Sequence, residues 1–206
     1  MGLFNFFSKK DSDKKQAAIV ESEIPETNSL EVIFSGYEIP KELIQVFNFD
    51  QSECLNSSFS EGSEFARTND KLLISSWSNN EQFMEKLLPF GQASAGGSEY
   101  VLWLTENSLS NCPVLIFGDE GGVHCIADNI KELLRILSFD SEPIVGHKGV
   151  RFVKNENKSP MNSNFRTLLS GLGIKPVSEL NEIEKIISEA DQKYGSSFKE
   201  WLSQYV

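Results

Sequence analysis

The chain has 206 residues, of which 39% are hydrophobic and 24% are charged, and its formal net charge is −11. This length predicts one folded domain with a packed core rather than two small domains. No apolar run approaches the roughly 20 residues that cross a bilayer, which argues against stable membrane insertion. The three cysteines show no CxxC spacing, which argues against a disulfide framework and a zinc knuckle. We therefore expect a cytoplasmic protein with reduced thiols.

The N-terminal residues combine an apolar tip, Leu3 to Phe7, with the charged run KKDSDKK and a stretch of low apolar content. The apolar tip is too short to form the core of a secretory signal. These features predict a flexible N-terminal arm over residues 1–28, followed by one domain over residues 29–206.

Acidic residues are concentrated between Ile19 and Phe65, where ten carboxylates face a single base, Lys41. Such a charge field repels nucleic acid and attracts a basic protein partner; the alternative is a solvated surface that raises solubility. The candidate partner-binding residues from this segment are Glu31, Glu38, Glu42, Glu53, Glu61 and Glu64, and a later turn adds Asp119 and Glu120.

The first elements of the domain are read from short apolar patterns. The run LEVIF at residues 30–34 predicts a short strand. Residues 39–49 predict a helix that begins at Pro40 and buries Leu43, Ile44 and Phe47 on one face.

Two further elements are expected before the first glycine-rich loop. The run DKLLISSW at residues 70–77 predicts a strand, with residues 64–69 as its hairpin partner. Asn79 and Gln82 have capping-box spacing, which predicts a helix that continues through Leu88 and ends at Pro89.

Two glycine clusters raise the question of a nucleotide site. A phosphate-binding loop follows a strand and begins a helix, and its Walker form ends in Gly-Lys-Ser or Gly-Lys-Thr. Residues 91–97 instead lead into the strand-like run YVLWL, and residues 118–122 join the strand-like runs VLIF and VHCIA. We therefore expect turns and no nucleotide. The glycines most expected to have positive φ or a close backbone approach are Gly91, Gly97 and Gly121.

The C-terminal half shows stronger helical patterns. Residues 129–137 predict a helix that begins at an Asn129–Glu132 capping box and carries an apolar stripe. Residues 149–155 predict an edge strand, residues 165–174 a short helix, and residues 180–190 a longer helix that ends near Gly195. This order of elements predicts an α+β domain with a mainly antiparallel sheet flanked by helices, which we expect on one face.

Three stretches carry turn and core positions in a recognisable order: PFGQASAGGSEYVLWL, CPVLIFGDEGGVHCIADNIKELLRIL and the later ADQKYGSSFKEWL. Together they resemble the SUKH superfamily, the Smi/Knr-like proteins, over roughly residues 83–140 with further support near the C-terminus. The acidic segment before residue 65 and residues 140–176 depart from the family pattern, so the partner is left open. The matching positions are Phe90, Gly91, Gly97, Trp103, Pro113, Val114, Gly118, Glu120, Gly121, Ala127, Asn129, Leu133 and Leu134.

The resemblance implies a SUKH-like fold that serves as a binding module without catalytic residues of its own. Many bacterial members act as immunity proteins that neutralise toxins, often nucleases, and eukaryotic relatives regulate cell-wall synthesis. For this chain it implies an immunity protein with a basic toxin domain as partner, and its acidity suits such a partner. An intracellular scaffold or regulatory adaptor of the Smi/Knr type is the alternative.

A hydrolase of unknown substrate is the remaining alternative. His124, Asp119 and Cys125 could be imagined as a metal site, and Cys125 with His147 as a nucleophile pair. Neither set has supporting spacing, and a lone histidine in a strand is more often structural. We therefore expect no catalytic, metal or cofactor-binding residues.

Overall fold

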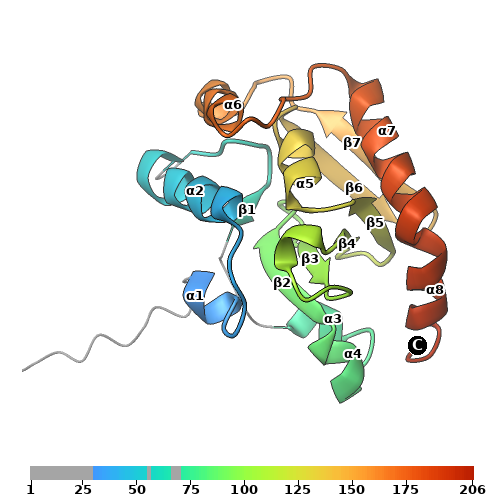
Figure 1. Cartoon of the computed structure of the whole chain (residues 1–206). Coiled ribbons are helices and arrows are strands. Elements are labelled where there is room, and N and C mark those ends of the chain that lie inside the picture. Colours follow the sequence, from blue (N-terminus) through green and yellow to red (C-terminus); the bar gives the residue numbers. More distant parts are fainter. Residues whose placement is uncertain (1–29, 55–56, 66–70) are drawn as a thin grey trace, which may run out of the picture.

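The computed structural model describes residues 30–54, 57–65 and 71–206 and confirms the α+β class (Figure 1). A five-stranded antiparallel sheet has the strand order β1-β2-β3-β4-β5, and the antiparallel hairpin β6-β7 forms a second, two-stranded sheet. The predicted arm over residues 1–28 lies outside the described residues. The strands are β1 (Glu64–Phe65), β2 (Leu87–Gln92), β3 (Glu99–Trp103), β4 (Val114–Phe117), β5 (Val123–Ala127), β6 (Ser141–Gly146) and β7 (Gly149–Lys154).

The main sheet is buried on both faces, which corrects the expectation of helices on one face only. Successive side chains of a strand point to opposite faces. Tyr100 and Leu102 accordingly belong to one hydrophobic core, and Val101 and Trp103 belong to a second. The near-continuous apolar runs of β3 and β4 reflect this two-sided burial.

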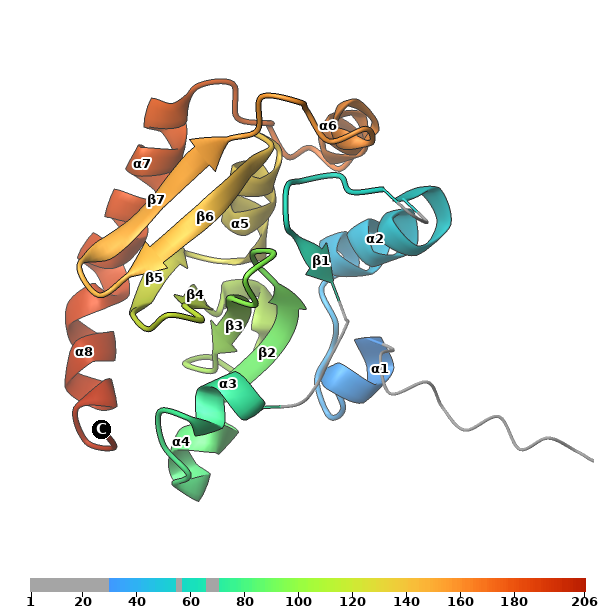
Figure 2. The same ribbon diagram turned by 180° about the vertical axis from the view of Figure 1, so that it is seen from behind.

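Different helices cover the two faces (Figures 1 and 2). The first core receives side chains from α1 (Leu30–Ile33), α2 (Lys41–Phe49), α5 (Ile130–Leu137) and α6 (Asn162–Gly171). The second core receives side chains from α3 (Leu72–Ser75), α4 (Glu81–Glu85) and α8 (Ser196–Leu202). Two short helical turns, η1 (Asp50–Cys54) and η2 (Leu109–Asn111), complete these layers.

Helix α7 (Leu180–Ala190) lies along β5 and covers the edge of the sheet (Figure 1). It continues through a π-helical turn, η3 (Asp191–Gly195), into α8. Ile183 and Ile186 of α7 reach the first core, whereas Phe198 of α8 reaches the second. The C-terminal helices therefore wrap around an edge strand that would otherwise expose its backbone groups.

Two short segments were predicted as strands and are helical. Residues 30–33 form α1, and residues 72–75 form α3. Short apolar runs do not distinguish a strand from a buried helical turn, because their periodicity is too brief to decide. The predicted hairpin between residues 64–69 and 70–77 is also wrong, since β1 pairs with β2; residues 66–70 lie outside the described residues.

The predicted helix over residues 79–88 is wrong in its second half. Asn80 caps α4 by accepting a hydrogen bond from the Phe83 N–H at 3.2 Å, and α4 ends at Glu85. Leu87 then pairs with Trp103 in the sheet. Pro89 lies inside β2, next to the register shift between Pro89 and Gly91, where a strand tolerates a missing N–H.

The predicted buried face of α2 also needs correction. Leu43 and Val46 are fully buried, whereas Ile44, which was expected on the buried face, is 39% exposed.

The predicted β4–β5 hairpin and the predicted helix at Ile130–Leu137, α5, are confirmed. Asn129 caps that helix by accepting from the Glu132 N–H at 3.1 Å, while the Glu132 carboxylate accepts from Arg135 instead of closing the box.

The three glycine predictions are confirmed. Gly97 has φ +102° and Gly121 has φ +98°. A Cβ on Gly91 would lie 2.7 Å from Cδ1 of Phe65, so glycine at this position lets β1 approach β2 closely.

Across the described ranges, no helix is both long and apolar enough to span a membrane.

Candidate functional site

The candidate carboxylates differ in how available they are. Glu31 on α1, Glu38 before α2 and Glu53 on η1 are exposed, and so is Glu120 in the β4–β5 turn. Glu61 and Glu64 are half-buried. The carboxylates that a partner could reach therefore lie in two places: on the segment from α1 to η1, and in the β4–β5 turn, where Asp119 is also exposed.

Glu42 is a structural carboxylate rather than an exposed one. Its side chain is 6% exposed and lies 3.2 Å from the Lys131 ammonium, so it joins α2 to α5. Burial alone would raise the pKa of Glu42, but a backbone N–H bond and the nearby Lys131 and Lys41 charges outweigh it and lower the pKa below its ordinary value. Glu42 is therefore charged at neutral pH.

Glu38 and Glu42 line one depression, which we name the α2 groove. It has a volume of about 480 Å³ and is also lined by Lys41 of α2, Lys131 of α5 and the loop after β3, which contributes Asn107, Ser108 and Ser110. Tyr37 and Ile44, on the same segment, are 40% and 39% exposed. Exposed aromatic side chains such as Tyr37 are enriched where proteins bind proteins.

Asp119 is engaged in a turn contact. The Ser98 hydroxyl donates to Oδ1 of Asp119 at 2.6 Å, and the Asp119 N–H donates to the Ser98 hydroxyl at 3.3 Å. Glu142 of β6, which sequence reasoning missed, accepts from the Ala95 N–H at 2.9 Å. The two carboxylates thus hold the β2–β3 loop, and residue 62 packs against the same loop.

Glu61 is likewise engaged within the fold. Its N–H donates to Oδ1 of Asp140 at 3.1 Å, and its carboxylate accepts from the Asn155 amide. Glu64 lies on β1, where it pairs with Gln92. The candidate carboxylates therefore fall into two sets: Glu31, Glu38, Glu42 and Glu53 on the α1–η1 side, and Glu61, Glu64, Asp119 and Glu120 on segments around or next to the β2–β3 loop.

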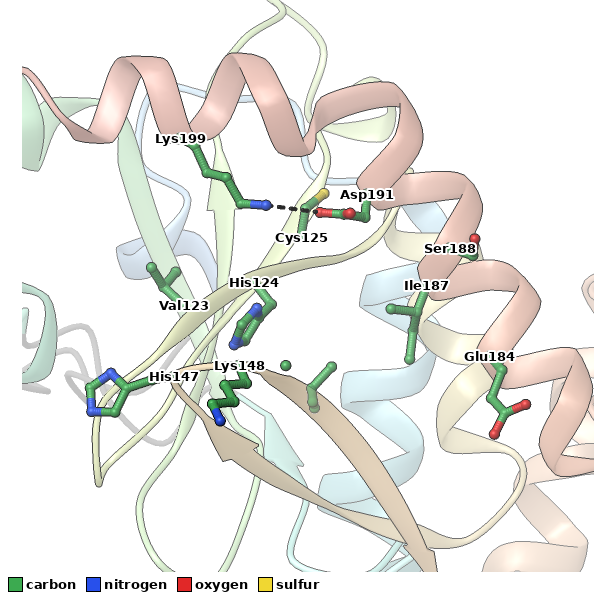
Figure 3. Close-up of a pocket in the computed structure, with 12 residues that line it drawn as sticks. Val123, His124, Cys125, His147, Lys148, Glu184, Ile187, Ser188, Asp191 and Lys199 are labelled. Carbon is green, nitrogen blue, oxygen red and sulfur yellow. Dashed lines mark ion pairs between the residues drawn. The ribbon is translucent and has the colours of Figure 1, made fainter.

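A second depression lies between β5, the β6–β7 turn and the C-terminal helices (Figure 3). We name it the His124 cavity; its volume is about 440 Å³. Its ionisable lining residues are His124, Cys125, His147, Lys148, Glu184, Asp191 and Lys199.

His124 has a fixed role in this cavity. Its Nε2 atom lies 2.7 Å from the carbonyl oxygen of Gly146. A carbonyl oxygen only accepts, so Nε2 carries the proton and donates it to the β6–β7 turn. His147 at that turn packs against Gly121, where a Cβ would come within 2.8 Å of its ring. Both histidines thus join the β4–β5 and β6–β7 turns.

Cys125 does not have the properties of a nucleophile. Burial, followed by the charges of Asp128 and Asp191, raises the pKa of its thiol to about 12. A neutral thiol is a poor nucleophile and a poor metal ligand. Figure 3 shows Cys125 and His147 far apart along the cavity, so they do not form a pair.

The imagined metal site is not assembled either. Asp119 is bonded to Ser98, and Cys125 is 2% exposed and belongs to the second core. Within the described ranges, no group of three His, Cys, Asp or Glu side chains could hold a metal ion.

The π-helical turn places the charged pair of this cavity. Asp191 begins the turn, and its carboxylate lies over Gly195, so a side chain at residue 195 would require the Asp191 carboxylate to move. Lys199 lies 3.9 Å from Asp191 (Figure 3). The sequence pattern did not single out either residue, because Gly195 predicts the end of a helix, whereas the chain forms a π-helical turn there and continues into α8.

The chain was compared with family models, curated proteins and solved structures. None of the three comparisons gives a significant match. The resemblance to the SUKH superfamily therefore rests on the sequence motifs themselves and stays a prediction.

Proposed function

We propose that this protein is a non-enzymatic, cytoplasmic binding module whose α1–η1 side binds a basic protein partner. The SUKH-like motifs favour a specific form of this proposal, an immunity protein that neutralises a basic toxin domain. Exposed carboxylates are the observation that carries it: Glu38 lines the α2 groove, and Glu31 and Glu53 lie on the neighbouring elements α1 and η1.

The surface of α1, α2 and η1 supports a protein partner over a small substrate. Tyr37 and Ile44 supply exposed apolar area outside the groove lining, and Glu31, Glu38 and Glu53 supply negative charge. Inside the α2 groove, Lys41 and Lys131 balance the charges of Glu38 and Glu42. Basic side chains of a partner would be attracted over a distance near the Debye length, roughly 8–10 Å at ordinary salt. Association is then fast at low salt and slows as salt rises.

The test is co-expression of this protein with the basic toxin domain encoded beside its gene, together with binding kinetics for the purified pair. The triple variant E31K/E38K/E53K should reduce the association rate more than about tenfold at low salt and should reduce protection of cells. A matched control, E184K/E189K/E200K, changes the net charge equally on exposed positions of α7 and α8 and should bind as the wild type.

The outcomes separate the parts of the proposal. If both triple variants protect fully and bind at the wild-type rate, the acidic α1–η1 side is not the interface. If the wild-type protein never protects against its neighbouring toxin but recovers housekeeping proteins from cells, the adaptor replaces the immunity protein.

A further inference from the structure

Three cationic side chains line a smaller cavity at the junction of α5, β7 and α6. Lys154, Lys158 and Arg166 surround a volume of about 260 Å³, together with one carboxylate, Asp140. Figure 2 shows the end of β7 leading toward α6 at the same end of the hairpin where β6 begins. In a chain with a net charge of −11, this concentration of positive charge stands out. We name it the Lys158 cavity.

The three cations have no carboxylate partner in the described part of the chain. Ion pairs within 4.0 Å engage Lys131, Arg135, Lys185, Lys193 and Lys199, but none of the three cavity cations. The Lys154 ammonium lies 5.4 Å from the centre of the Phe139 ring, a contact that leaves its charge uncompensated.

Asp140 does not neutralise these cations directly, because neighbouring donors occupy its carboxylate. Oδ1 accepts from the Ser159 hydroxyl at 2.6 Å and from the Glu61 N–H at 3.1 Å, and Oδ2 accepts from the Ser159 N–H at 2.5 Å. The side chain is 4% exposed. Asp140 thus holds Ser159 and Glu61 next to the start of β6. Its carboxylate is used in these bonds, so the positive charges of Lys154, Lys158 and Arg166 dominate the cavity.

Arg166 is held in place at the wall of the cavity. Its Nη1 donates to the carbonyl oxygens of Ser138 at 2.8 Å and Val177 at 2.5 Å, and its Nη2 donates to the Ser178 hydroxyl at 3.3 Å. A guanidinium has more N–H donors than these three bonds use. Arg166 lines the cavity, so its charge acts on an acceptor bound there.

The backbone around this cavity is unusual. Among the described residues, only Asp140 with φ 60° and Lys158 with φ 39° have positive φ without being glycine. Both line the Lys158 cavity. Residues with a Cβ adopt this region at an energetic cost and cluster where a function requires it. The bonds to Ser159 and Glu61 hold Asp140 in this conformation, and Lys158 follows the turn at residues 156–157.

We propose that the Lys158 cavity binds a phosphate group. Three cations minus one carboxylate give the lining a net charge of +2, which matches a phosphate or phosphomonoester dianion. Lysine and arginine form strong charge-assisted hydrogen bonds to phosphate oxygens. Asn155 and Ser178 also line the cavity. The Asn155 amide gives one hydrogen to Glu61, and its second hydrogen and the Ser178 hydroxyl can complete the hydrogen bonding. This site is independent of the α2 groove.

The binding test uses the full chain titrated with inorganic phosphate and, separately, with O-phosphoserine, at an ionic strength held constant with chloride. Thermal unfolding and backbone amide shifts measure binding, because a ligand of the native state raises the melting temperature. We expect saturable shifts at Lys154–Lys158 and Asn162–Arg166. Tighter binding of O-phosphoserine identifies a phosphomonoester as the occupant, and equal or tighter binding of inorganic phosphate identifies the free ion. Saturation by neither compound overturns the proposal.

Two variants localise the site. Lys158→Gly keeps the positive φ at no steric cost and removes the ammonium, so it should fold at least as well and bind about tenfold more weakly. K154Q/K158Q should bind more weakly still. The control K185Q, whose side chain is 74% exposed on α7, should bind as the wild type. Wild-type affinity in K154Q/K158Q contradicts the assignment.

Discussion

At the scale of single residues, the β4–β5 turn shows why particular glycines are required. Gly122 has φ +87°, and a Cβ there would lie 2.5 Å from the carbonyl oxygen of Gly146. A Cβ on Gly118 would meet the carbonyl oxygen of Gly121 at 2.5 Å. These contacts are to backbone, which cannot move aside as a side chain does. Gly122 therefore lets the β4–β5 turn pack against Gly146, to which His124 also bonds, and Gly118 lets the β4–β5 turn close on itself.

The first prediction is that Gly122→Ala lowers the free energy of unfolding by about 2 kcal/mol or more, because strain at positive φ adds to a backbone clash. Gly171→Ala is the control: nothing lies within 4 Å of its Cβ position, at the end of α6. Alanine there should be neutral or stabilising by up to about 1 kcal/mol. Urea denaturation measures both. Equal stabilities for the two variants would show that the turn relaxes around the added methyl group.

At the scale of elements, the pair of Glu42 and Lys131 connects two helices that are far apart in the sequence. Glu42 lies in the first turn of α2, where a carboxylate interacts favourably with the helix N-terminus. Lys131 lies on α5, which packs against the sheet through Leu133, Leu134 and Leu137. The pair therefore anchors the acidic α2 segment to the most strongly amphipathic helix, and it shapes the wall of the α2 groove.

The second prediction follows from the lowered pKa of Glu42. A carboxyl group whose pKa is lower in the folded state stabilises the fold above its unfolded value, about 4.5, and loses this contribution as the pH falls through the folded value. Glu42→Gln should therefore be less stable than the wild type at pH 7, and the difference should shrink below pH 4.5.

Chemical denaturation at both pH values measures this difference, and Glu53→Gln, an exposed position on η1, is the control. If the loss of stability caused by Glu42→Gln grows as the pH falls, its pH dependence has the wrong sign, and the lowered pKa of Glu42 is refuted.

At the scale of the whole molecule, two hydrophobic cores share one sheet. Aromatic side chains fill both cores: Phe59 and Phe165 are in contact in the first, and Trp103 and Trp201 in the second. Because α7, η3 and α8 run continuously from one core to the other, the C-terminal helices couple the two faces. The described residues thus bury both faces of the sheet.

The third prediction is that a chain starting at Ser29 unfolds cooperatively with the stability of the full chain. The preceding residues contain little apolar surface to offset the entropy of ordering them. Denaturation curves of the two proteins should have the same midpoint and slope. A shorter chain that is insoluble, or that loses its cooperative transition, would show that the Phe-rich N-terminus packs on the domain.

Local patterns in the sequence were sufficient for elements with several agreeing signals. Asn129 with the stripe Ile130, Leu133 and Leu137 defines α5, because capping and periodicity act between near neighbours. Glycines between two β-branched runs define the β4–β5 hairpin for the same reason. The α+β class follows from the order of these elements.

Only the tertiary structure decided the form of the short apolar runs and which distant residues meet. Leu87 and Leu88 belong to a strand because β3 is available for pairing, and residues 72–75 are helical because a short apolar run takes the form its neighbours allow. The fold places Glu42 beside Lys131, and it places Lys154, Lys158 and Arg166 around one cavity. These residues are too far apart in the sequence for a local pattern to predict that they meet. Burial and charge pairing across the fold depend on which elements meet, and the sequence determines this only through the packing of the whole core.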